Sequence, residues 1–388
     1  MSEQPSFGIV ASLRGSVESG APFGILTTYF RDLVEHAMQC GWEAYVFSPR
    51  DVLRQRRVIW GWKRKNGTWK RAFVPTPQIG YLRSNTFTPA DKKVFLWLRD
   101  EVGTQFINQP EVEEIVFDYW RLIQIGLSHP TLIGRIPDSI LLRGDLSLTE
   151  TMKLDSHYLV RPRFALRQGA AEITRFEDTF HVRYEYKNSI IDEDFNSVVQ
   201  LRDSLHVHFG DAIIQHLPKL FRVENCIIGI RSFWQRDRSG RWKENFSILR
   251  VSQPSNHTDQ LATVGLLERY LPFLSRSLKS QMEAVRYQII NISRTFVELI
   301  DQRGHGASEL SVDLLITREK QVILAGVSTL GGMYALKKIQ IPELRHKVMS
   351  TTLNYATTLY EQTHVTPIGV SEVNSTPTQI HQTALDAS

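Results

Sequence analysis

Cysteine is nearly absent from this sequence, since 388 residues include only Cys40 and Cys226. The two lie far apart and form no C-x-x-C spacing, so neither a disulfide framework nor a zinc site is indicated. Such low cysteine use fits a reducing compartment. No stretch reaches the roughly 18 apolar residues of a membrane span, and the first twenty residues lack a basic segment followed by an apolar run. We therefore expect a soluble, cytoplasmic protein with no membrane partner.

A strong charge of either sign is also missing. The 46 Lys and Arg residues exceed the 41 Asp and Glu residues by 5, and apolar residues make up 42% of the chain, as in ordinary globular proteins. So small a surplus does not by itself indicate nucleic-acid binding. The segments 58–74 and 226–252 do combine tryptophan with Lys and Arg, which could stack on bases and neutralise phosphates. Aromatic cross-strand pairs on solvated hairpins explain the same residues more simply, so nucleic acid is not an expected partner.

The short motifs of several enzyme classes are missing as well. The sequence contains no G-x-x-x-x-G-K-[ST], G-x-G-x-x-G, H-E-x-x-H or G-x-S-x-G. His206 and His208 alternate in a segment with strand character, which would place both rings on one face. No third ligand accompanies them, so a metal site is not indicated there.

The first part of the chain shows the alternation of a parallel sheet. Strand patterns and one helical pattern follow one another at 7–13, 26–41 (helical), 42–49 and 77–85. Asn66-Gly67, between the two arms of 58–74, is a strong hairpin signal. The order strand, helix, strand predicts a βαβ opening, and the patterns together predict an N-terminal α/β domain that ends near residue 125.

From residue 126 onward, hairpin patterns replace that alternation. Strand-like segments lie at 157–163, 171–187 and 226–252. An antiparallel α+β arrangement fits them better than further βαβ units. A chain of this length is also expected to form two or three packed units rather than one.

Two helices are expected in the last third of the chain. Between 266 and 303, apolar residues recur every three or four positions, which predicts one long helix that packs a single stripe on a sheet, with a short coiled-coil seam as the alternative. Pro272 would lie in its first turn. A closing helix is expected at 342–364, with Pro342 at its start. Residues 366–388 are rich in Ser and Thr and are predicted to be disordered.

The segment 309–332, ELSVDLLITREKQVILAGVSTLGG, indicates two strands joined by a charged turn. With residues 317–320 as the turn, the predicted cross-strand pairs are Ile316–Gln321, Asp313–Leu324, Ser311–Gly326 and Glu309–Ser328. Side chains two residues apart in a strand share a face. One face of this hairpin is therefore predicted to present Glu309, Ser311, Asp313, Leu324, Gly326 and Ser328.

Nine stretches, taken in order, carry a resemblance to a known family. They are 23–52, 77–84, 105–109, 135–139, 158–162, 213–220, 227–243, 309–316 and 322–332. Each is weak alone, but their order and spacing resemble the endospore coat-associated YheC/YheD proteins of spore-forming bacteria. The resemblance spans residues 7–364.

That family is similar to the ATP-grasp ligases, in which two α+β subdomains clamp a nucleotide and an N-terminal α/β domain helps to form the substrate cleft. The resemblance implies a pre-ATP-grasp α/β domain at 1–125, an ATP-grasp-like domain at 126–365 and a role in the spore coat. It implies ATP and Mg as cofactors, with nucleotide and spore coat proteins as partners. Magnesium and Lys or Arg would share the neutralisation of the triphosphate during carboxylate–amine ligation.

The family pattern assigns nucleotide binding to Arg161 and Gln215. Arg161 stands in V-R-P, where the family commonly has lysine before proline, and it is still a cation. Gln215 falls just before the adenine-side linker. The loop that should be rich in glycine keeps only Gly169, so fewer backbone groups could approach phosphates closely.

The same pattern assigns the metal to Asp313 and catalysis to Arg231 and Glu309. ATP-grasp enzymes carry Glu-x-Asn on the second strand of this hairpin, where the present chain has Gly326 and Ser328. The lysine and proline that usually follow are replaced by Leu330 and Gly331. Magnesium usually takes one or two carboxylates together with phosphates and water, and one carboxylate with one hydroxyl is a poor set.

Two hypotheses about activity stay open. The first is a pseudoenzyme, ATP-grasp-like but with a degraded metal and nucleotide site, that has a structural or regulatory role in spore coat formation. The second is an active ATP- and Mg-dependent carboxylate–amine ligase in which Glu309 and Asp313 supply two carboxylates. Simpler interpretations exist for each residue: Asp313 as a solvated or capped strand acid, and Glu309 with Arg231 as an ion pair between neighbouring strands.

Overall fold

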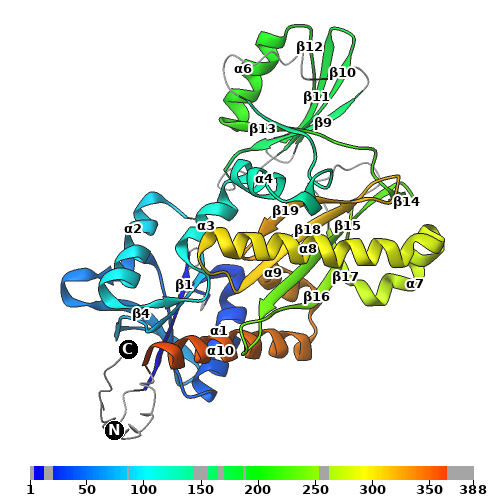
Figure 1. The fold of residues 1–388 in the computed structure, drawn as a ribbon. Helices are drawn as coiled ribbons and strands as arrows, with labels where there is room; N and C mark the ends of the chain where they lie inside the picture. The colour runs from blue at the N-terminus through cyan, green and yellow to red at the C-terminus, as the bar shows by residue number, and fades with distance from the viewer. Residues whose placement is uncertain are drawn as a thin grey trace, which may run out of the picture.

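The computed structural model contains three sheets with helices between and around them (Figure 1). The residues described are 4–12, 21–84, 87–142, 152, 156–164, 170–186, 189–252 and 262–364. The predicted tail at 366–388 and the loop that holds Gly169 lie outside these residues. Across the described ranges, no helix combines the length and the apolar character needed to cross a membrane.

The N-terminal part of the chain builds the first sheet. Its strands, in sheet order, are β3 (Val52–Leu53), β4 (Val58–Lys65), β2 (Glu43–Phe47), β1 (Ser6–Ala11), β6 (Ile79–Arg83) and β7 (Gln105–Phe106), with β5 (Thr68–Pro75) on β4. β1 pairs in parallel with β2 and β6, and α1 (Thr27–Gln39) connects β1 to β2. The predicted βαβ opening is therefore confirmed. All of β1 is buried because apolar clusters cover both faces of the sheet.

β4 and β5 form the hairpin predicted around Asn66-Gly67. The φ angles of these two residues are 50° and 73°, which a tight two-residue turn requires and which Asn and Gly tolerate. Shorter elements complete this part of the chain: η1 (Gly24–Leu26), η2 (Pro49–Asp51), η3 (Arg54–Arg56), α2 (Pro89–Trp97) and η4 (Leu98–Val102).

The second sheet is antiparallel throughout. Its strands, in sheet order, are β12 (Ser189–Phe195), β11 (Thr179–Tyr186), β10 (Ala171–Phe176), β9 (His157–Pro162), β13 (Ala212–His216) and β8 (Ser139–Leu142). One face packs against α6 (Val198–Phe209) through Leu201, Leu205 and Phe209. His206 and His208 lie in α6, so their prediction as strand residues sharing one face is wrong. The three buried residues are spaced four apart, as on one face of a helix, and this spacing is a stronger signal than the alternation of His206 and His208.

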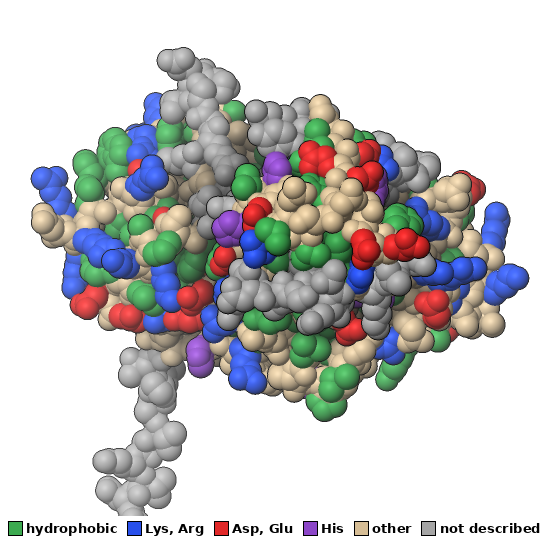
Figure 2. Space-filling model, turned by 90° about the horizontal axis from the view of Figure 1, so that it is seen from above, with side chains coloured by type: hydrophobic (Ala, Val, Ile, Leu, Met, Phe, Trp, Pro, Cys, Tyr) green, Lys and Arg blue, Asp and Glu red, His purple; other side chains and the backbone are tan. Residues whose placement is uncertain are grey.

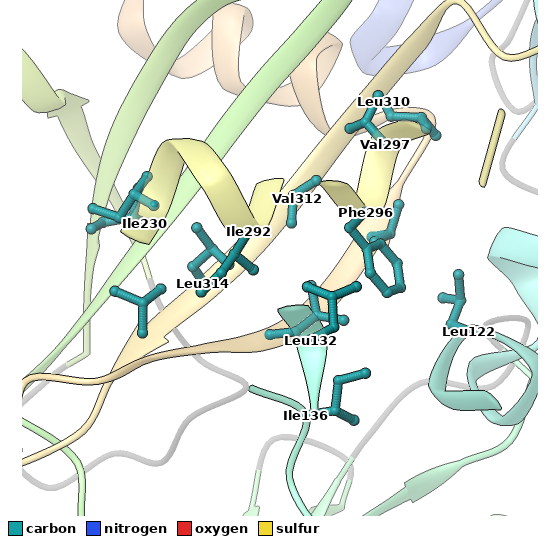
Figure 3. Close-up of a cluster of buried hydrophobic side chains, with 14 of the residues drawn as sticks. Leu122, Leu132, Ile136, Ile230, Ile292, Phe296, Val297, Leu310, Val312 and Leu314 are labelled. Carbon is teal, nitrogen blue, oxygen red and sulfur yellow. The ribbon is translucent and has the colours of Figure 1, made fainter. Parts of the chain in front are cut away.

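The third sheet is also antiparallel and runs β17 (Ala262–Leu266), β16 (Trp242–Val251), β15 (Cys226–Arg236), β18 (Glu309–Ile316), β19 (Val322–Ser328), with β14 (Arg222–Val223) on β15. α8 (Met282–Gly304) covers one face. Figure 3 shows Ile292, Phe296 and Val297 of α8 against Leu310, Val312 and Leu314 of β18. On the other side, α9 (Gly331–Ile339) and α10 (Pro342–His364) pack against β15, and α10 has the predicted limits.

The single helix predicted over 266–303 is in fact two. α7 (Leu267–Leu278) and α8 are separated by η6 (Lys279–Gln281), and Lys279 has a φ of 52° that ends α7. Pro272 lies in the interior of α7 rather than in its first turn. The apolar spacing continues through the break because both helices pack on the same core, so the spacing alone could not reveal it.

Two short helices connect the first sheet to the rest of the chain. α3 (Pro110–Phe117), α4 (Tyr119–Leu127) and the turn η5 (Pro130–Leu132) follow β7, and they pack against α8. Tyr119, at the start of α4, receives a backbone contact from the second sheet, because its N–H donates to the Arg163 carbonyl at 2.9 Å. The start of α4 therefore lies where the second and third sheets meet.

Candidate functional site

The register of the β18–β19 hairpin differs from the predicted one. Asp313 pairs with Gly326 and Ser311 with Ser328, whereas Leu314 pairs with Leu324. The turn is one residue longer than predicted, and a β-bulge after Asp313 leaves Ala325 as an extra residue. Leu324 therefore faces the α8 core, and its predicted place opposite Asp313 is wrong. Gly326 and Ser328 do share the face of Asp313.

Asp313 is bound on this face by two arginines, one from the adjacent strand β15 and one from the next strand, β16. Arg231 of β15 donates to both carboxylate oxygens, each at 2.7 Å, and Arg250 of β16 contacts the Oδ1 atom at 3.3 Å. Burial alone would raise the pKa of Asp313, but the charges of Arg231 and Arg250 outweigh it and hold that pKa below its usual range. Burial would likewise lower the pKa of Arg231, and Asp313 reverses the direction. The interpretation of Asp313 as a solvated acid is therefore wrong.

This donor set does not fit magnesium as it stands. Both oxygens of Asp313 are engaged by a guanidinium, and Ser328 Oγ accepts a hydrogen bond from the Leu330 N–H at 3.0 Å. Within the described residues, no group of three or more His, Cys, Asp or Glu side chains could hold a metal ion. Magnesium needs near-octahedral oxygen coordination, which this face does not supply.

Gly326, Gly331 and Gly332, in and after β19, have different surroundings. A Cβ on Gly326 would have only Tyr119 Cε1 within reach, at 4.0 Å, so this position borders open space. A Cβ on Gly331 would lie 2.6 Å from Ser311 Oγ, and one on Gly332 would lie 2.2 Å from the Phe233 ring. These two glycines let α9 begin directly against the sheet, where a larger residue would clash.

Arg161 of β9 and Gln215 of β13 lie together on neighbouring interior strands of the second sheet, near β19. Arg161 Nε donates to Gln215 Oε1 at 2.7 Å, and its Nη1 donates to the Ala325 carbonyl of β19 at 2.9 Å. The guanidinium also lies over the ring of Tyr119, 4.7 Å from its centroid. A small cavity lined by Tyr119, Arg161, Gln215 and Gly326 separates the two sheets here. The predicted phosphate-side cation is thus adjacent to the predicted metal face.

Glu309 belongs to a different cluster, at the junction of the first and third sheets. Its side chain accepts hydrogen bonds from Arg83 Nη2 at 2.5 Å, Tyr81 Oη at 2.7 Å and Gln235 Nε2 at 2.8 Å. The side chains of Arg83 and Glu309 are 0% and 3% exposed. The alternative ion pair between Glu309 and Arg231 is therefore not formed, since each has another partner. Nor does Glu309 supply a second carboxylate beside Asp313.

The sequence pattern identified only Glu309 in this cluster, and the charged members that it missed are Arg83 and Glu113. Arg83 Nη1 donates to the Thr329 carbonyl at 2.6 Å, and Thr329 Oγ1 donates to Glu113 Oε2 at 2.8 Å. Burial raises the pKa of Glu113 to about 7. The sequence signal for Arg83 is its position at the end of the otherwise apolar strand I-G-Y-L-R. A charged residue in such a buried strand indicates a buried partner.

The two α+β sheets that face one another across Arg161 and Gly326, preceded by an α/β sheet, define an ATP-grasp fold. D-alanyl-alanine synthetase A from Vibrio cholerae is similar, with a TM-score of 0.56 and 10% identity over 92% of this chain and 99% of that one. D-alanine–D-alanine ligase from Bacillus anthracis has a TM-score of 0.53 and 12% identity. The ATP-grasp ligase PsnB, complexed with a phosphomimetic variant of minimal precursor, Mg and ADP, has a TM-score of 0.53 and 11% identity. Each of these two matches covers 92% of this chain and 99% of the other chain.

The profile of the YheC/D like ATP-grasp family matches residues 104–359, about two-thirds of the sequence. The chain therefore belongs to that family, as the resemblance indicated. Among curated proteins, none matches this chain.

Proposed function

We propose that the protein is a non-catalytic ATP-grasp protein with a structural or regulatory role in spore coat formation. The observation that carries the proposal is the state of Asp313, which two arginines neutralise on a face where Gly326 and Ser328 replace the Glu and Asn of ATP-grasp enzymes. Phosphoryl transfer depends on cations that neutralise the triphosphate, and magnesium is held by carboxylates. The spore coat part of the proposal is supported by the resemblance to the YheC/YheD proteins.

The test of non-catalytic character is a pair of measurements on the purified chain. ADP release from ATP with Mg should stay at the background of a protein-free control. Millimolar ATP with Mg should raise the melting temperature no more than ATP with a chelator, because a ligand stabilises a protein only in proportion to its binding. Magnesium-dependent ATP turnover that disappears in Asp313→Asn would overturn the proposal.

The second candidate is an active ATP- and Mg-dependent carboxylate–amine ligase. The observation that favours it is Arg161, which lies beside Gly326 at the mouth between two sheets, where a phosphate-binding cation is needed. Two similar structures contain nucleotide, PsnB with Mg and ADP and the Bacillus anthracis ligase with ATP. This candidate requires Arg231 to release Asp313 when nucleotide enters. Turnover sensitive to both Arg161→Ala and Asp313→Asn would favour it over the first.

The spore coat role has its own test. A tagged copy of the chain, produced at its native level, should appear in the coat fraction of mature spores and co-purify with coat proteins. An even distribution through the cytoplasm of spore-forming cells, with normal spores when the chain is deleted, would remove this part of the proposal and leave the non-catalytic assignment untouched.

A further inference from the structure

The basic charge of this chain is concentrated in one segment, residues 50–71. It contains nine Lys or Arg residues and one Asp, a local surplus of 8, while the whole chain has a surplus of 5. The rest of the chain therefore carries a net charge of −3. Figure 2 shows Lys and Arg side chains at the left edge of the molecule, on the side where Figure 1 places β4, and others at the right edge, on the side of α7.

Four arginines of this segment have no acidic partner. Lys63, Arg64 and Arg71 form ion pairs within the first sheet, with Glu43, Glu35 and Asp51. Among the described residues of this segment, the exposed basic side chains that form no ion pair are Arg50, Arg54, Arg56, Arg57, Lys65 and Lys70. The four arginines lie close together in sequence, and the Arg54 guanidinium lies 5.8 Å from the centroid of the Trp97 ring. Unpaired arginines on one short stretch are not needed for stability, and surface ion pairs contribute little in any case. Their charge is available to a partner.

An exposed apolar cluster lies beside these arginines. Leu53 pairs with Val58, two residues before Trp60, and Trp60 pairs with Phe73, so Leu53, Trp60 and Phe73 share one face. Trp60 and Phe73 are 37% and 59% exposed, and their ring centroids are 4.6 Å apart. Aromatic side chains with arginine at the rim are typical of protein–protein interfaces. We call Leu53, Trp60, Phe73, Arg50, Arg54, Arg56 and Arg57 the basic surface.

The opposite charge is concentrated on the distal edge of the second sheet. β12 ends that sheet and carries three consecutive exposed acids, and the turn between β10 and β11 adds two more. Ile190, at the start of β12, is 56% exposed. We call the exposed acids Glu177, Asp178, Asp192, Glu193 and Asp194, with Ile190, the acidic edge. Asp192 and Asp194 contact His181 of β11, and Arg183 lies 3.6 Å from Asp192, so the acids of this edge are partly neutralised within the sheet. Glu177, Asp178 and Glu193 give the acidic edge a charge opposite to that of the basic surface.

The two surfaces cannot meet within one molecule. Figure 1 places β12 at the tip of the second sheet and β4 on the opposite, N-terminal side of the molecule. We propose that the acidic edge of one copy of this chain docks on the basic surface of another copy. Because the two surfaces differ, the contact is head-to-tail, and such contacts build rings or open filaments rather than closed symmetric dimers. The inference does not depend on the nucleotide site.

Charge exchange tests the contact with the intact protein. One variant, Arg54→Glu, Arg56→Glu, Arg57→Glu, makes the basic surface acidic. The other, Asp178→Lys, Glu193→Lys, Asp194→Lys, makes the acidic edge basic. Each variant alone presents two surfaces of one sign and should sediment as a monomer, whereas an equimolar mixture pairs unlike surfaces and should associate again. Arg269→Glu, Arg276→Glu, Arg286→Glu is the matched control, since these exposed arginines of α7 and α8 undergo the same charge change elsewhere.

The expected result is that the unmodified protein and the control sediment as oligomers at low ionic strength and as monomers near 1 M salt, where the Debye length falls to about 3 Å. A monomer at every salt concentration would overturn the proposal. So would a mixture of the two variants that stays monomeric while circular dichroism shows both folded. Retention of single-stranded DNA or of poly-glutamate by the basic surface, without self-association, would identify another occupant and also overturn it.

Discussion

Arg231 and Asp313 form a two-point ion pair between adjacent strands of the third sheet, with both N–O distances at 2.7 Å. In an ATP-grasp enzyme the acid at this position would face a metal. Here a guanidinium occupies its two oxygens, and Arg250 adds a second positive charge on the same side. The pair supplies a counter-charge for Asp313 that is part of the fold, so the protein does not need a metal to keep this acid ionised.

Arg231→Met should destabilise the protein by about 2–4 kcal/mol, somewhat less than the usual loss for a broken buried pair because Arg250 still faces Asp313. The folded-state pKa of Asp313 is lowered, so the pair stabilises the protein above the unfolded-state pKa, near 3.9, and this contribution is lost as pH falls through the folded-state pKa. In urea denaturation, the free energy of unfolding of Arg231→Met should therefore be well below that of the unmodified protein at neutral pH, and this difference should shrink in acid. Arg294→Met, in an exposed pair with Glu298, is the control with little effect. An Arg231→Met difference that is independent of pH would contradict this account.

Glu113 should make stability fall as pH rises. Its folded-state pKa is about 7, above the ordinary value of 4.5, so the folded protein holds a proton that the unfolded chain has lost between these two values. Glu113→Gln keeps the shape of the protonated acid and should flatten the stability profile between about pH 4.5 and pH 7. Glu114→Gln, at the neighbouring exposed position, should leave the profile unchanged. If stability depends on pH in the same way for the unmodified protein and for Glu113→Gln, Glu113 does not hold a proton in the folded protein over this range.

Arg83 and Glu309 should be strongly coupled across the junction of the first and third sheets. Arg83→Met alone leaves a buried carboxylate without its main partner and should cost about 3–5 kcal/mol. The double variant with Glu309→Gln should lose less than the sum of the two single losses, by about 1–3 kcal/mol. The same cycle on Lys63 and Glu43, a half-exposed pair, should give a coupling below about 1 kcal/mol. Additive losses at Arg83 and Glu309 would mean that the contact does not hold the junction.

Much of the fold followed from local patterns, and the site followed only in part. Parallel strands, the Asn66-Gly67 turn and the closing helix are set by residues near one another in sequence, so their prediction was confirmed. The bulge at Ala325 and the break at Lys279 depend on packing with distant elements, which no local pattern records. The contact of Glu309 could not be predicted for the same reason, because its partner Arg83 lies 226 residues away in the sequence.

Gly326 lies just before the end of β19 and Gly332 lies just after it, and substitution by alanine should change stability differently at the two positions. Gly326→Ala places its methyl group in open space and should change stability by less than about 1 kcal/mol. Gly332→Ala drives a methyl group into the Phe233 ring at 2.2 Å and should destabilise by about 1–3 kcal/mol or more. Thermal denaturation of the two variants, made in the same background, measures the contrast. Equal losses would show that α9 does not pack against the sheet as closely as described.

Returning the family's acid to β19 should give a magnesium response larger than that of the unmodified protein. Position 326 lies opposite Asp313 and borders open space, so Gly326→Glu can be accommodated, and Ser328→Asn restores the second ligand position. Because Arg231 would still occupy Asp313, the two changes are best combined with Arg231→Met, which frees Oδ2 and leaves Oδ1 only its 3.3 Å contact with Arg250.

The triple variant should gain melting temperature from ADP with Mg relative to ADP with a chelator, by an amount equivalent to about 2.7 kcal/mol at a hundredfold excess over the Kd. Gly326→Gln in the same background has nearly the same size without the charge, and it should show no such difference. Magnesium in proteins usually takes one or two carboxylates, so equal responses from the Glu and Gln variants would show that the acid at position 326 does not decide whether the ion binds here.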